Sequence, residues 1–512
     1  MRGRGRDSWR SWALVEDAQK SRDCRVARHD FRRVGSRCRS WGKAVHSPPL
    51  RRPRCHRIPS LVTPSPLDAF LVAATVPRTG LHADGTITRA EQLRASLAAP
   101  ADMGIHAAAV LGDADAIARF LEATPSDATR VGGPHGWDPL TYLCFSNYLK
   151  LDRTRDEDFV RAATLLLDAG ADANTGFFEP GHEPTPMFES ALYGACGVAH
   201  HAPLTRLLLA RGADPNDDEV PYHAPESYDN AALEALVGSG RLTADSLTTL
   251  LLRKSDWHDL AGVRYLLAHG ADPRRASRWA RNILLHAISR DNALPLVEAL
   301  LDHGADPREA DLHGSAFAAA ARHGRGDLLR AFEARGFTEE LSGTDALIAA
   351  CARADGRAAT RIARDDATAS AALRARAGTL LARFAGVGNH EGIALLLDLG
   401  IPVDHPLDPV RGYFTIVPGS TALHVAAWRA RHETVALLLD RGADANARAA
   451  DGSTPLALAV RACVDSHWAD RRRPDSVARL LAAGASVAGV PVPSGYDAID
   501  ALLLTHGTPR RP

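Results

Sequence analysis

The sequence feature that most restricts the fold is a short pattern, L-L-x-x-G, that returns along the chain. It ends at Gly170, Gly212, Gly270, Gly304, Gly400, Gly442 and Gly484, in segments such as LLLDAGADAN and LLLDRGADAN. The intervals are 42, 58, 34, 96, 42 and 42 residues, and a degenerate copy, LLRAFEARG, ends at Gly336 and divides the longest into 32 and 64. A period of about 33 residues with insertions predicts stacked repeats.

Each part of the unit has a physical reason. The leucines predict the buried face of a helix, and the glycine predicts its end, because a left-handed residue with a Cβ would cost roughly 1–2 kcal/mol. A second turn follows at Asp451-Gly452. Thr454 can then cap the next helix, and Pro455 suits its first position, where no N–H is required. One unit is therefore a helix, a finger-like turn and a second helix.

This unit resembles the ankyrin repeat. The segment GSTALHVAAWRARHETVALLLDRGADANARAADGSTPLALA (419–459) follows the family pattern G-x-T-P-L-H-x-A-A, a helix break, a second helix and L-L-L-x-x-G-A-D. The resemblance implies an all-α ankyrin repeat solenoid over 66–512, built from about eleven or twelve helix-turn-helix units with β-turn fingers. We expect an irregular segment at 215–260, where no normal finger occurs, and a capping helix at 494–507, because terminal repeats must shield the core.

The N-terminal arm, residues 1–65, differs from the repeats. Its first 60 residues carry 15 Arg and 2 Lys against 5 acidic residues, a net charge of +12, while the rest of the chain carries −12. Clustered arginines can contact nucleic acid, but we favour a solvated, disordered tail or a misplaced translation start. Only 4 of 61 basic residues are lysine, which indicates a GC-rich coding sequence, and we expect a bacterial protein.

Composition indicates the compartment. Hydrophobic residues make up 45% of the chain and charged residues 24%, and no apolar run approaches the roughly 18 residues of a membrane span, so we expect a soluble protein with no membrane contact. The seven cysteines form no C-x-x-C pair. An odd number without framework spacing favours a reducing compartment, and we predict a cytoplasmic monomer.

Candidate catalytic residues have structural interpretations. Asp256, His258 and Asp259 lie together in KSDWHD and could bind a metal or move protons, but we favour a solvated turn between helices. His106, His286 and His424 hold the motif position where the resemblance implies a hydrogen-bonded structural imidazole. The chain contains no H-E-x-x-H, G-x-x-x-x-G-K-[ST] or G-x-S-x-G. We therefore predict no enzyme, no cofactor and no metal.

The resemblance implies a binding surface. In ankyrin arrays the fingers and first helices line a concave groove, toward which the fifth, eighth and ninth motif positions of each unit point. We expect groove contacts from Tyr142, Phe145, Glu189, Tyr193, Arg290, Arg322, Arg383, Trp428 and Arg429, and Asp291 and His323 hold equivalent positions. Aromatics and arginines are common interface anchors, and we expect the Trp428 ring to be partly exposed.

These observations predict a non-catalytic scaffold that binds a protein partner through the groove, with nucleic acid not favoured as the partner. Two alternatives stay open at this stage. An enzyme would build its site from convergent polar side chains in 215–260, and an effector delivered into a host cell would carry a secretion signal, which the N-terminus does not show.

Overall fold

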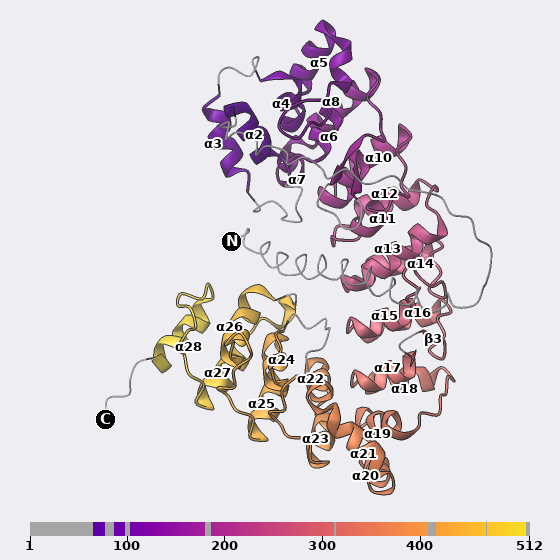
Figure 1. Cartoon of the computed structure of the whole chain (residues 1–512), viewed down its shortest axis with the longest axis vertical. Helices are drawn as coiled ribbons and strands as arrows, with labels where there is room; N and C mark the ends of the chain where they lie inside the picture. Colours follow the sequence, from indigo (N-terminus) through magenta and orange to yellow (C-terminus); the bar gives the residue numbers. More distant parts are fainter. Residues whose placement is uncertain are drawn as a thin grey trace, which may run out of the picture. The chain divides into compact units, whose positions relative to one another are not determined.

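The computed structural model describes residues 65–76, 86–97, 103–179, 186–311, 314–407, 416–466 and 468–507 (Figure 1). The predicted arm at 1–65 lies outside these residues except for Ser65. The chain divides into two compact units, with the boundary between Val220 and Pro221. We call the described residues up to 220 the first unit and those from 221 onward the second unit. The boundary falls inside the segment expected to be irregular.

The first unit is built from short helices and one hairpin. Its elements are α2 (Pro66–Ala74), α3 (Thr88–Ala95), α4 (Gly104–Leu111), α5 (Ala114–Ala123), η3 (Pro125–Thr129), α6 (Pro139–Cys144), α7 (Asn147–Leu151), η4 (Arg153–Arg155), α8 (Asp156–Asp168), β1 (Gly176–Glu179), β2 (Met187–Ser190), α9 (Ala191–Tyr193), the π-helix η5 (Gly194–Val198) and α10 (Ala202–Ala210), with α11 (Val220–His223) at the boundary. The finger expected after Gly170 forms the antiparallel pair β1–β2, with Gly176 opposite Ser190.

The second unit contains the most regular helix pairs, which Figure 1 shows following one another from α13 onward. Its elements are α12 (Ala231–Gly238), α13 (Ala244–Asp256), α14 (Leu260–Ala268), α15 (Ile283–Ser289), α16 (Leu294–Asp302), β3 (Ala310–Asp311), β4 (Gly314–Ser315), α17 (Ala316–Arg322), α18 (Gly326–Ala334), α19 (Gly343–Ala352), α20 (Gly356–Asp365), α21 (Ala367–Ala375), α22 (Ala377–Val387), α23 (His390–Asp398), α24 (Ala422–Trp428), α25 (His432–Asp440), α26 (Pro455–Asp465), η6 (Ala469–Arg471), α27 (Asp475–Ala482) and α28 (Asp497–Gly507). Helix α28 occupies the segment expected to cap the array. The all-α class predicted from the sequence is confirmed.

The sequence signals for helix ends are confirmed in this unit. Gly442 follows α25 with φ of +87°, the left-handed conformation that favours glycine. The Thr454 side chain caps α26 by accepting a hydrogen bond from the Ala457 N–H at 3.2 Å, and Pro455 is the first residue of that helix. Because the cap and the stop are encoded locally, each helix pair begins and ends where its own sequence directs.

The core is a continuous layer of small and branched side chains between successive helices. First helices α13, α15 and α17 pack side by side, as do their partners α14, α16 and α18. Leu300, Leu328 and Leu438 from the L-L-x-x-G segments are fully buried. Burial of these leucines is what makes each pair depend on its neighbours, because one pair cannot cover its own apolar face.

An additional helix interrupts the regular alternation. Helix α21 lies between α20 and α22 in the chain, and α19 packs against both α21 and α23. The Asn389 amide in the turn after α22 donates hydrogen bonds to the carbonyls of Gly324, at 2.7 Å, and Ala352, at 2.8 Å. The turn that leaves α22 is therefore tied to the ends of both α17 and α19.

Candidate binding site: an arginine cluster around Asp291

The groove candidates of the first unit form a buried aromatic cluster. Tyr142 and Phe145 are buried, and Trp137 packs against both, with ring centroids 5.2 and 5.7 Å away. Phe145 also meets Phe177 and Tyr193 edge-on, at 5.0 and 5.8 Å. These rings pack against one another, so the cluster forms part of the hydrophobic core of the first unit.

Glu189 is also buried, on strand β2, where it pairs in register with Phe177. The Tyr142 hydroxyl donates to the Gly132 carbonyl and accepts from the His135 N–H, both at 3.2 Å. The polar end of Tyr142 is therefore satisfied inside the protein. Contact of these residues with a partner stays a prediction.

The expected partial exposure of Trp428 is wrong. Its side chain is 7% exposed and packs in a cluster with Ala430 and Ala462, against which Ile416 and Leu458 also pack. The motif position that should face a groove is covered here because the segments before α24 and along α26 close over the ring.

Two of the arginine candidates are paired with carboxylates. Arg290 contacts the Asp256 carboxylate at 2.6 Å, and Arg322 forms an ion pair with Asp345. Both side chains are half-buried. The carboxylates of Asp256 and Asp345 therefore balance the charges of these two arginines. The other two arginine candidates, Arg383 and Arg429, belong to a separate cluster.

Arg383 and Arg429 belong to a cluster that forms around one carboxylate. Asp291, directly after α15 at a left-handed φ of +56°, forms an ion pair with Arg429, 138 residues further along the chain. The His323 ring at the end of α17 places Nδ1 3.7 Å from the other Asp291 oxygen. We define the Asp291 cluster as Asp291, His323, Arg383, Arg429, Arg431 and Arg471.

The arginines of the cluster come from different elements. Arg383 lies on α22, Arg429 and Arg431 flank the turn between α24 and α25, and Arg471 ends η6. The Arg431 Nε donates to the Gly386 carbonyl at 2.8 Å. The Trp468 ring lies 5.3 Å from the Arg429 guanidinium and 5.7 Å from that of Arg471, distances at which a cation is attracted to an aromatic face.

A glycine makes room for the Arg429 side chain. A Cβ at Gly386, near the C-terminal end of α22, would lie 3.2 Å from the Arg429 Nη1 and 3.3 Å from its Cδ. The Arg429 side chain therefore runs across α22 at close contact on its way to Asp291. This packing leaves Arg429 2% exposed.

The electrostatics of the cluster follow from burial and from crowding of like charges. Burial lowers the pKa of Arg383, and nearby Arg322 lowers it further, although Asp291 opposes them. Burial, Arg471 and Arg429 together lower the pKa of Arg431 to about 10. Burial would raise the pKa of Asp291, but Arg429 and His323 together outweigh burial and hold that pKa well below its usual range. The cluster therefore combines several guanidinium groups with one carboxylate, Asp291, that acts on them all.

The expectation of a solvated turn at Asp256, His258 and Asp259 is wrong for the two carboxylates, which are 4% and 6% exposed. Asp256 accepts hydrogen bonds from Arg253 at 2.6 Å and from the His286 ring at 2.7 Å. Lys254 donates to Asp259 at 2.8 Å. Polar side chains of the 215–260 segment therefore converge, but they neutralise one another as buried ion pairs.

The structural interpretation of the motif histidines is confirmed. The His424 ring accepts from the Thr421 N–H at 3.1 Å and contacts the Ser453 carbonyl at 3.2 Å, which joins the start of α24 to the next finger. His106 contacts the Arg130 carbonyl at 2.7 Å, and His286 contacts Asp256 as described. These imidazoles hold neighbouring repeats in register.

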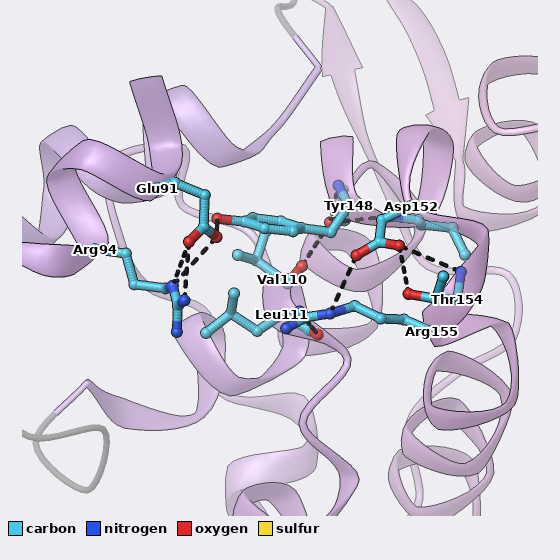
Figure 2. Close-up of polar contacts among 10 residues, drawn as sticks. Glu91, Arg94, Val110, Leu111, Tyr148, Asp152, Thr154 and Arg155 are labelled. Atoms are coloured by element: carbon cyan, nitrogen blue, oxygen red, sulfur yellow. Dashed lines mark hydrogen bonds and ion pairs between the residues drawn. The ribbon is translucent and has the colours of Figure 1, made fainter. Parts of the chain in front are cut away.

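A second polar site, in the first unit, joins α3 to α7. Figure 2 shows the Tyr148 hydroxyl donating to Glu91 at 2.6 Å, while Arg94 pairs with the same carboxylate at 2.8 Å. Arg155 donates to the Leu111 carbonyl at 2.9 Å and faces Asp152 at 3.5 Å. The hydrogen bond from Arg94 is the main cause that lowers the pKa of Glu91. Each arginine of this site therefore lies next to a carboxylate of opposite charge.

A cavity of about 320 Å³ lies beside this site. Its charged lining is balanced between three arginines and three aspartates: Arg94, Arg155, Arg161, Asp113, Asp115 and Asp158. Because Arg161 pairs with Asp115 at 3.1 Å across an exposed surface, the cavity has no excess charge to attract an ion. The Asp291 cluster, with its excess of cations, is the stronger candidate.

The comparison with family models agrees with one of these helix pairs. Residues 418–450 match the family model of the ankyrin repeat, a segment that contains α24 and α25. Residues 418–450 are therefore an ankyrin repeat. Among solved structures, the ankyrin repeat domain of human ASB11 is similar, with 21% sequence identity, 44% of this chain and 98% of that chain covered, and a TM-score of 0.20. No curated protein matches the chain. Within the part of the chain that the structure describes, no helix is long and apolar enough to cross a membrane.

Sequence reasoning missed Arg431 and Arg471 because neither occupies a motif position. Arg431 directly precedes the second helix α25, and Arg471 lies in the insertion RACVDSHWADRRRPD, which contains the turn between α26 and α27. The run Arg471-Arg472-Arg473 in that insertion was the available signal. Insertions into repeat arrays often contribute to a binding face.

Proposed function

We propose that the chain is a non-catalytic scaffold that binds a protein partner through its fingers and first helices. Ankyrin repeats generally mediate protein–protein interaction. The observation that supports the proposal most directly is an exposed aromatic side chain on a finger of each unit. Phe178, in the β1–β2 finger, is 64% exposed, and Trp279, between α14 and α15, is 40% exposed.

The surroundings of Trp279 resemble an interface anchor. The Arg278 guanidinium lies 4.5 Å from the ring centroid, and Tyr222 meets the ring edge-on at 5.8 Å. Tryptophan, tyrosine and arginine are the residue types that contribute most to protein interfaces. A partner that covers Trp279 would gain the burial of an aromatic ring already held in position by its neighbours.

The proposal also covers the compartment. The four cysteines in the described residues, Cys144, Cys196, Cys351 and Cys463, are buried and form no disulfide. This arrangement supports a reducing environment, and we propose a monomer in a bacterial cytoplasm. The paired charges around Asp256 support a structural role for the 215–260 segment over a catalytic one.

Site-specific photocrosslinking in the native cell tests the proposal. A photoreactive phenylalanine analogue replaces Trp279 in one variant and Phe178 in another. The control carries it at Arg264, which is exposed on the second helix α14 of the same repeat as Trp279. We expect one protein to be crosslinked from the finger positions and not from position 264. Equal crosslinking from all three positions, or none from the fingers, would refute the proposed surface.

A further inference from the structure

Within the part of the chain that the structure describes, the Asp291 cluster gathers four guanidinium groups around one shared carboxylate. Four guanidinium groups, those of Arg383, Arg429, Arg431 and Arg471, act electrostatically on the single carboxylate of Asp291. We propose that this cluster binds a compact oxyanion of the phosphate class. The proposal goes beyond the protein-binding role, because it concerns a small ligand held at the ends of the first helices.

Two arginines near the cluster, Arg325 and Arg322, each pair with a carboxylate that balances their charge. Arg325 makes a two-point contact with Asp327, at 2.9 and 2.7 Å, and Arg322 pairs with Asp345. Each of these guanidiniums therefore has its own carboxylate. In the cluster, by contrast, the same carboxylate, Asp291, acts on all four arginines. Arg471 also has a marginal 4.0 Å contact with the exposed Asp470.

Hydrogen-bond donors in the cluster are left over. In the described residues, Arg383 Nε and Arg471 Nη1 are buried and have no hydrogen-bond partner. A buried charged donor without an acceptor destabilises the fold, because it has lost its hydrogen bonds to water and no protein group replaces them. An oxyanion placed between these groups would supply both the missing acceptor and the missing negative charge.

The geometry fits an anion with several acceptor oxygens. The guanidiniums belong to three separate segments, α22, the α24–α25 turn and η6. A tetrahedral phosphate can accept from several such groups at once, and planar guanidiniums bind it through paired N–H groups. The Arg471 side chain is 28% exposed, which makes it the side chain that an entering anion can displace.

Burial favours a compact ligand over an acidic peptide. Arg429 is 2% exposed and is held against α22 at Gly386, so an extended chain could reach it only by separating helices. A free phosphate or pyrophosphate needs only the movement of Arg471. The phosphoryl group of a phosphoprotein has the same chemistry, and the experiment must separate the two sources.

The test uses the full chain in a buffer free of phosphate. Inorganic phosphate, pyrophosphate and a short phosphoserine peptide are titrated by calorimetry, and thermal unfolding is followed at constant ionic strength set with sodium chloride. We expect saturable binding of pyrophosphate and a thermal midpoint that rises with its concentration, because a ligand that binds only the folded state stabilises it.

Two variants and one control locate the site. Arg383→Gln and Arg471→Gln each remove a guanidinium with an unpartnered nitrogen, and each should weaken pyrophosphate binding by about 10- to 100-fold, as loss of a charge-assisted hydrogen bond does. Arg330→Gln removes an exposed arginine from α18 and should leave the affinity unchanged. Circular dichroism confirms that each variant is folded, and the partly exposed Arg471 keeps one informative variant if Arg383→Gln fails to fold.

Three results would overturn the proposal. The first is no saturable binding of either free anion by the folded wild-type chain. The second is an equal loss of affinity in Arg330→Gln and in the cluster variants. The third is tighter binding of the phosphoserine peptide than of pyrophosphate, which would assign the cluster to a phosphorylated protein. None of these outcomes depends on whether the fingers crosslink to a partner.

Discussion

Equivalent repeat positions carry opposite chemistry in the two units. In the first unit they hold Tyr142, Phe145 and Tyr193, which pack with Trp137 and Phe177 into a buried aromatic cluster. In the second unit they hold Asp291, His323, Arg383 and Arg429, which form the charged cluster. Aromatic rings that pack together stabilise one another by direct contact. Guanidinium groups that lie close together repel one another, and their N–H groups still require hydrogen-bond acceptors. The same positions thus stabilise one unit and equip the other to bind.

The largest expected effect is on the aromatic side of this comparison. Tyr142→Ala should lower the free energy of unfolding by about 3–5 kcal/mol, because it empties a fully buried ring site. Tyr142→Phe, which removes only the hydroxyl, should cost about 1 kcal/mol. Urea unfolding monitored by circular dichroism measures both. A loss below about 1 kcal/mol for the alanine variant would mean that the ring is available to a partner, as its motif position first suggested.

The second prediction concerns the carboxylate of the charged cluster. Asp291→Asn should lower the free energy of unfolding by about 3 kcal/mol, since it leaves buried guanidiniums without their anion. Asp398→Asn is the control, because Asp398 is 66% exposed in its pair with Arg441 and should matter by less than about 0.5 kcal/mol. Pyrophosphate should restore part of the loss in Asp291→Asn alone. Equal losses in the two variants would show that Asp291 does not balance the cluster.

The sequence predicted what is encoded within one repeat. The stop at Gly442, the cap at Thr454 and the bonded ring of His424 each depend on residues close in the chain or at a fixed repeat distance. The class of fold followed from the spacing of such signals. These features could be read because their physical causes are local.

Contacts between distant repeats could not be predicted in the same way. Asp291 meets Arg429 across 138 residues, a stretch in which the chain adds α21 and ties the turn after α22 to the ends of α17 and α19. A repeat pattern in the sequence predicts whether the side chain at each motif position faces the groove or the core. That prediction assumes that the repeats stack regularly. The burial of Trp428, and of Asp256 and Asp259 in an expected solvated turn, also depends on which neighbouring segments cover them.

A smaller effect should appear in the dependence of stability on pH. Burial lowers the pKa of His323, and Arg383 lowers it further, while Asp291 and its 3.7 Å contact oppose them. As the pH falls below about 6.5, the unfolded chain takes up this proton before the folded chain does, so stability is lost. His323→Gln should therefore lose less stability than the wild type between pH 7 and 5.5. Urea midpoints across that range measure the difference, and parallel curves would place His323 outside the field of the arginines.

The smallest expected effect on stability tests how tightly Arg429 is held. Gly386→Ala should gain up to about 1 kcal/mol of helix propensity, but the new methyl group would press on Arg429 at 3.2 Å. Because Asp291 fixes that guanidinium, the two effects should nearly cancel in the free energy of unfolding, while pyrophosphate affinity falls by about 3- to 10-fold. Gly238→Ala in α12 is the matched control, since a Cβ there meets nothing within 4 Å, and it should gain stability without changing affinity. If Gly386→Ala gains as much as Gly238→Ala and binds pyrophosphate normally, the Arg429 side chain moves freely. The charged cluster would then lack the rigid packing that its aromatic counterpart possesses.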